Sequence, residues 1–156
     1  MSITSYFKSD KKEKEPEKNK NGRDGSPGSG PNKVKIASDL GEADHEPVQP
    51  KLASFNPKQY GNSKRDFSAS WYNGRTWLEY SVEKGAAFCF PCRHFKSSSK
   101  DRTLFTKEGY SNWRHAFDKQ KGFQKHENSQ THVEAMVIWQ ERKMRIEKNQ
   151  SVSILW

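Results

Sequence analysis

The 156-residue sequence is poor in apolar residues and holds only two cysteines. Hydrophobic residues make up 31% of the chain, charged residues 30%, and the mean hydropathy is −1.15. No window approaches the roughly 18 apolar residues of a membrane span, and the N-terminus has no apolar core of the kind found in secretion signals. We therefore expect an intracellular protein that does not enter a membrane.

Aromatic residues are missing from a long stretch near the N-terminus. None lies between Lys8 and Pro50, where the sequence alternates Lys with Glu and then becomes rich in Gly, Ser and Pro. Ordering a residue costs about 1–2 kcal/mol of backbone entropy, and such a segment buries too little to offset that cost. The expected organisation is a disordered arm over 1–51, one compact domain over 52–149 and a tail without evident role over 150–156.

Positive charge is concentrated in the part that we expect to fold. Residues 1–52 carry 10 Lys and Arg against 9 Asp and Glu, a net charge of +1. Residues 53–156 carry 18 against 10, a net charge of +8. A folded basic domain suggests a polyanionic partner, most often nucleic acid. A basic domain without such a partner is the alternative, and charge alone does not decide between them.

The two cysteines and two of the histidines have the spacing of metal ligands. Cys89 and Cys92 form a C-x2-C pair, and His126 and His132 follow at H-x5-H spacing. Two thiolates with two neutral imidazoles make a closed, charge-neutral tetrahedral site for Zn²⁺, which suits a structural role. The alternatives are a redox dithiol, which lacks the expected βαβ surroundings, or two ordinary buried cysteines.

Two further histidines are spare candidates for the metal. His94 lies two residues after the second cysteine, which is poor spacing for the same ion, and we interpret it as a phosphate or base contact. His115 is interpreted as a surface residue of a helix, and the alternative is that it replaces His126 as a ligand.

The patterning predicts a small α+β fold built around a β-hairpin. Strands are expected over 75–82 and 86–90, joined by a turn at Gly85, and Pro91 should end the second strand because it cannot donate to a sheet ladder. A short helix is expected over 111–119 and a longer one over 129–148. Most aromatic residues, which could also be stacking platforms for nucleic acid, are expected in the core: Trp71, Tyr72, Trp77, Tyr80, Phe88, Phe90, Phe95, Trp113 and Phe117.

Several longer motifs, with the His126-x5-His132 pair, resemble one known family. The TTF-type zinc finger of hAT-family transposases and of domesticated zinc finger MYM-type proteins has similar segments at 65–67, 71–72, 77–82, 87–95 and 109–113. The resemblance covers residues 50–148. It implies zinc on Cys89, Cys92, His126 and His132, DNA binding and a nuclear location. Such transposases continue into a catalytic domain with an RNase H-like fold, which we do not find here, so we expect no enzymatic activity.

The expected function is a zinc-dependent DNA-binding module that takes no small-molecule substrate. The expected phosphate contacts are Arg93, Lys96, Lys100 and Arg102 beside the cysteines, and Arg114, Lys119, Lys121 and Lys125 around the connection between the helices. The alternative is a protein-interaction module whose charged C-terminal helix docks a partner. An enzyme has little support, because the cysteines would be used as ligands and no nucleophile–base arrangement stands out.

Overall fold

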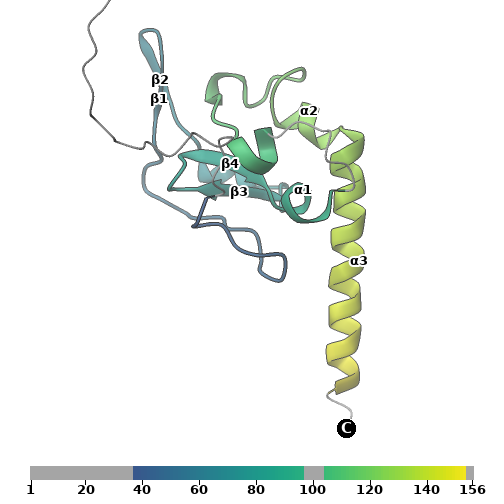
Figure 1. The fold of residues 1–156 in the computed structure, drawn as a ribbon. Coiled ribbons are helices and arrows are strands. Elements are labelled where there is room, and N and C mark those ends of the chain that lie inside the picture. Colours follow the sequence, from purple (N-terminus) through teal and green to yellow (C-terminus); the bar gives the residue numbers. More distant parts are fainter. Residues whose placement is uncertain (1–36, 97–103, 154–156) are drawn as a thin grey trace, which may run out of the picture. The chain divides into compact units, whose positions relative to one another are not determined.

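The computed structural model describes residues 37–96 and 104–153, and within them it has the expected small α+β fold (Figure 1). Two antiparallel hairpins are formed by strands β1 (Lys58–Tyr60) with β2 (Ser63–Arg65) and β3 (Leu78–Ser81) with β4 (Ala86–Cys89). The helices are α1 (Phe90–Phe95), α2 (Phe123–Glu127) and α3 (Gln130–Ser153), with short helical turns η1 (Ala69–Tyr72), η2 (Leu104–Glu108) and η3 (Trp113–His115). None of the helices in these two ranges is long and apolar enough to cross a membrane.

The β3–β4 hairpin lies where the sequence predicted it, although both strands are shorter than expected. Its register pairs Leu78 with Cys89 and Ser81 with Ala86, and every strand residue is buried. Gly85 closes the turn with a φ of 57°, a conformation that costs glycine little. The hairpin is the centre of the fold, since segments from both sides of it in the sequence pack against it.

Residues before the predicted boundary at 52 belong to the folded domain. On one face of β4, Ala86 and Phe88 pack with Ala37, Leu40 and Val48. The Tyr80 N–H also donates to the Val48 carbonyl at 3.0 Å. The expected arm is therefore corrected over 37–51: a strand with two apolar faces needs a second cover, and this segment supplies it. Residues 1–36 of the expected arm lie outside the described residues.

An aromatic cluster covers the opposite face of the hairpin. Phe67 is central to it, with ring centroids 5.0 Å from Phe55, 4.8 Å from Tyr80 and 5.5 Å from Trp113. Tilted and edge-on pairs of this kind are the favoured aromatic geometries. The expected core role is confirmed for most of the aromatic residues, but Phe117 is 55% exposed.

The helix predicted over 111–119 is wrong. Only the short turn η3 forms, and the chain then folds back, with the Phe123 N–H donating to the Ala116 carbonyl at 2.8 Å. A Cβ atom on Gly122 would lie 2.1 Å from that same carbonyl oxygen. The glycine therefore permits a close backbone crossing that ends the helical turn early.

α1 and α3 bring the cysteine and histidine segments together. Pro91 lies in the first turn of α1, where its missing N–H costs nothing. Helix α3 packs against α1, with the rings of Phe90 and Trp139 5.3 Å apart, and buries His132, Ala135 and Trp139 along one stripe. The predicted helix over 129–148 is confirmed, and it continues through Ser153 into the segment expected to be a tail.

Candidate metal centre

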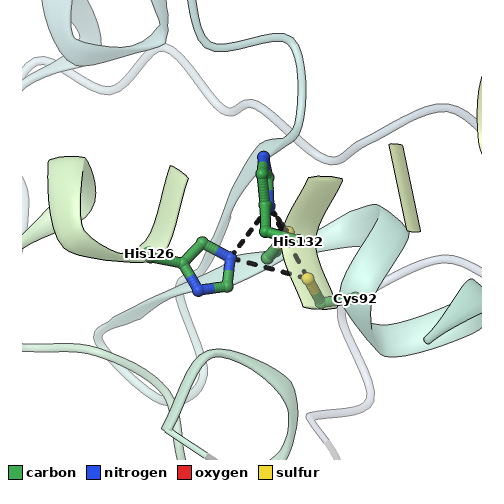
Figure 2. Close-up of side chains that lie close together, drawn as sticks. Cys92, His126 and His132 are labelled. Atoms are coloured by element: carbon green, nitrogen blue, oxygen red, sulfur yellow. Dashed lines mark hydrogen bonds between the residues drawn. The ribbon is translucent and has the colours of Figure 1, made fainter. Parts of the chain in front are cut away.

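Two cysteines and two histidines converge at one buried point. The ligand atoms that Cys89, Cys92, His126 and His132 offer all lie within 4.8 Å of one another. The Sγ atom of Cys89 is 3.3 Å from Nδ1 of His132, and the Sγ atom of Cys92 is 3.6 Å from both Nδ1 of His132 and Nε2 of His126. Figure 2 shows three of these side chains pointing toward one another. Spacing in the sequence predicted this set, and the four residues could bind a metal.

The distances fit the edges of a zinc tetrahedron. Bonds of about 2.3 Å to sulfur and about 2.0–2.1 Å to nitrogen place sulfur and nitrogen roughly 3.6 Å apart and two nitrogens roughly 3.3 Å apart. Three of the four S···N separations here are 3.3–3.6 Å, the N···N separation between His126 and His132 is 3.1 Å, and all four ligand atoms lie within 4.8 Å of one another. The donor set also has the softness that zinc prefers.

Short elements with defined ends position each ligand. Cys89 is the last residue of β4 and Cys92 lies in the first turn of α1, so the end of the strand aims both sulfurs to one side. His126 lies on α2 and His132 on the first turn of α3. Ser129 joins these two helices, because its hydroxyl donates to the His126 carbonyl at 2.7 Å and accepts from the His132 N–H at 3.3 Å.

Burial and mutual contact set the protonation of the ligands. A hydrogen bond from Cys89, together with the two histidines, lowers the pKa of the Cys92 thiol well below its usual range, whereas burial raises the pKa of Cys89. Burial also lowers the pKa of His126, which keeps its ring neutral. A neutral imidazole beside a thiolate is the state that binds a metal.

Two aromatic residues enclose the histidines. The ring of Trp77 lies 5.2 Å from that of His126 and 5.1 Å from that of His132, measured between centroids. Phe105 stacks on His126 at 4.2 Å. The sequence predicted a core position for Trp77, and nothing in the spacing of Trp77 or Phe105 relates these two residues to the ligands. Their rings cover part of the two histidines, and apolar surroundings of this kind strengthen electrostatic interactions at the site.

Arg93 does not contact solvent as a phosphate-binding residue would. Its side chain is 6% exposed and pairs with the fully buried Glu79, the Nε atom lying 2.7 Å from Oε1. It also donates to the Gly41 carbonyl at 2.9 Å. The expectation for Arg93 is corrected: one turn of α1 directs this cation inward, onto the carboxylate of β3 and the segment before residue 52.

The other predicted phosphate contacts that the structure describes are exposed or partly buried. Arg114, Lys119, Lys121 and Lys125 are exposed between η3 and α2, and Lys96 is partly buried at the end of α1. Lys100 and Arg102 lie outside the described residues.

The two spare histidines are not part of the cluster. His94 contacts the Gly41 carbonyl at 3.2 Å through Nε2 and packs on Phe90, while His115 lies 3.4 Å from Asp118. Neither residue is among the described groups that could hold a metal. The choice of His126 over His115 as the third ligand is therefore consistent with the geometry.

Two curated proteins are similar to most of the chain. Zinc finger MYM-type protein 5 of Macaca fascicularis and that of Homo sapiens are each 32% identical to it over 117 residues, which is 69% of this chain and 16% of the relative. The chain thus spans about a sixth of the length of these relatives. No family model matches the chain, and no solved structure matches it significantly. The match and the Cys and His cluster together support a relationship between this chain and the MYM-type zinc finger proteins.

Proposed function

We propose that this chain is a zinc-stabilised DNA-binding module of a nuclear protein. The observation that carries the proposal is the convergence of two sulfurs and two ring nitrogens within 4.8 Å at a buried point. A closed site of four protein ligands leaves no open position for a substrate, which is typical of structural zinc. Since both cysteines serve as ligands, we further propose that the module itself is not an enzyme.

The DNA-binding part of the proposal is supported by the exposed cations. Arg114, Lys119, Lys121 and Lys125 lie within the twelve positions that immediately precede the candidate ligand His126. Lysine and arginine contacts to phosphates provide affinity and position a protein on DNA. Ligation of His126 would hold this segment in place, so the metal would act on DNA binding through the fold. Membership of the TTF-type group is part of the same proposal.

A second candidate function is a protein-interaction module with α3 as the docking element. Val133, Val137 and Met144 are about half exposed or more and recur at helical spacing on α3. An apolar stripe of this kind on an exposed helix suits a partner helix or groove. Zinc would then have a purely structural role.

Measurement of the metal content tests the proposed zinc site. We expect one zinc per chain in the purified protein, lost together with far-UV circular dichroism signal after chelation and in His126→Ala. His115→Ala is the matched control, because this side chain is 34% exposed and lies outside the cluster, and it should keep both metal and structure. A folded, metal-free protein that is indifferent to His126→Ala would refute the zinc site.

Charge reversal separates the two candidate functions. Replacement of Arg114, Lys119 and Lys125 by Glu should abolish DNA binding and spare any partner that docks on α3. Val137→Asp with Met144→Asp should have the opposite pattern. Binding to duplex DNA should also fall steeply with salt, because each phosphate contact releases counterions; affinity that is flat between about 50 and 200 mM salt would contradict DNA as the partner.

A further inference from the structure

A small cavity lined by apolar and basic side chains opens beside the metal centre. Its volume is about 220 Å³, and Cys92 and His126 form part of its wall. Three lysines, Lys96, Lys121 and Lys125, line it as well, and no acidic residue is among the described residues that do so. We infer that this cavity is a phosphate-binding site, called the phosphate seat below, which binds one backbone phosphate of DNA. The inference rests on the proposed DNA-binding function and deepens it.

Charge and surroundings favour an anion in the cavity. A zinc ion held by two thiolates and two neutral imidazoles carries no net charge, so the positive potential comes from the lysines. Leu104 and Phe105 supply apolar walls, and an attraction between opposite charges is stronger next to apolar atoms than in bulk water. Thr106 and Thr131 also line the cavity.

The size of the cavity restricts the ligand. Pockets for cofactors and drug-sized molecules measure about 300–1,000 Å³, so a volume of about 220 Å³ suits a single phosphate group better than a whole nucleotide cofactor. The cations Arg114 and Lys119 lie outside this cavity but close to Lys121 in the sequence and are exposed. A polymer of phosphates is expected to contact further cations outside the seat. We therefore assign the bound phosphate to the backbone of DNA.

The metal site and the seat share structural parts. Lys125 immediately precedes the ligand His126 on α2, and Gly122, at the start of that helix, also lines the cavity. Ligation of His126 fixes α2 and with it the position of Lys125. The wider groove on α3, in contrast, is lined by Glu127 and Glu141 and would repel a phosphate.

The test uses the full, zinc-loaded chain and inorganic phosphate as the first probe. Phosphate titrated at constant ionic strength should give saturable amide shifts in nuclear magnetic resonance spectra at Thr106, Gly122 and Thr131. The shifts should disappear in the variant with Lys121→Gln and Lys125→Gln. The control with Lys64→Gln and Lys148→Gln removes the same charge from exposed positions on β2 and α3 and should keep them. Shifts that do not saturate, or that chloride reproduces, would overturn the seat.

Affinity for duplex DNA, measured by fluorescence anisotropy in a salt series, identifies the source of the phosphate. The Lys121 and Lys125 variant should bind about tenfold more weakly than the control variant, with the slope of log K against log salt lower by about one. Equal affinity of the two variants would overturn the inference while the DNA-binding function stands. Phosphate shifts in a chain that binds no DNA would instead refute the proposed function and DNA as the occupant together.

Zinc content and circular dichroism establish that each variant is folded. Should the double variant lose its zinc, the single variants Lys121→Gln and Lys125→Gln give the same test, each with a smaller loss of phosphate affinity than expected for the pair. Retention of full phosphate binding in both folded single variants would also overturn the seat.

Discussion

Nε2 of His126 and Nδ1 of His132 lie 3.1 Å apart, facing each other across the candidate metal centre. Two protonated nitrogens would repel each other at this distance, whereas two lone pairs can share one cation. The pair is therefore arranged for a metal or for a single shared proton. Since burial lowers the pKa of His126, its neutral form is favoured even somewhat below the usual histidine range.

Acid should release the metal and unfold the domain together. A histidine with a depressed pKa in the folded state stabilises that state above its unfolded pKa, and this stability is lost as the pH falls. Protons also compete with the metal for the thiolates. We expect zinc retention at pH 7 and cooperative loss of zinc and circular dichroism signal as the pH falls below about 6. His115→Gln should leave the transition unchanged; a shift in that variant would assign the transition to a group outside the centre.

Arg93→Gln should lower stability without changing DNA affinity. Removal of one partner from a buried ion pair leaves the other without compensation and costs about 3 kcal/mol. Burial already raises the pKa of Glu79 against the opposing effect of Arg93, so this carboxyl would be pushed further toward its neutral form. Urea unfolding of the zinc-loaded protein measures the loss. Weaker DNA binding by the fully folded variant would restore Arg93 as a phosphate contact.

Gly109→Ala should destabilise the domain by about 2–3 kcal/mol. Gly109 has a φ of +89°, and a Cβ atom there would lie 2.6 Å from that of Ala86 and 2.7 Å from the Phe88 ring. Gly74→Ala is the matched control, since its φ is also positive, at +73°, but the space around it is open; it should cost about 1 kcal/mol. Equal losses in the two variants, measured by urea unfolding, would show that backbone strain alone decides both.

A chain that begins at residue 52 should be less stable than one that begins at residue 33. The shorter chain loses the Val48 carbonyl that accepts from Tyr80 and uncovers Phe88. Exposure of a fully buried phenylalanine costs about 1.5–3 kcal/mol. Thermal unfolding of the two zinc-loaded chains compares them directly. Equal melting temperatures would mean that residues 37–51 contribute nothing to the fold, despite their contacts.

The candidate ligands could be predicted from the sequence because residue type and short-range spacing alone identify them. Sulfur and imidazole at C-x2-C and H-x5-H positions are sufficient to suggest zinc, whatever the chain between them does. The direction of Arg93 could not be predicted in this way. A charged residue after a cysteine has the same signature whether it faces solvent or a buried carboxylate on another strand.

The main errors in the predicted secondary structure and domain boundary have a common physical cause. Each depends on contacts between segments that are distant in the sequence. Trp113 and Phe117 have helical spacing, but the close crossing of Gly122 over Ala116 ends the turn, and Phe117 remains exposed. Residues 37–51 have few apolar side chains, yet Ala37, Leu40 and Val48 pack on a strand face that would otherwise be exposed. The short β1–β2 hairpin was not predicted, since Lys58–Tyr60 and Ser63–Arg65 have no strong alternation.

Helix α3 is held at one end only within the described domain. His132, Ala135 and Trp139 are buried, whereas nearly all residues from 140 to 153 are exposed. Its 24 residues give a length of about 36 Å at 1.5 Å per residue. The exposed part beyond Trp139 is 14 residues, about 21 Å, and it projects from the core in a direction set by the buried turns that contain the candidate ligand His132.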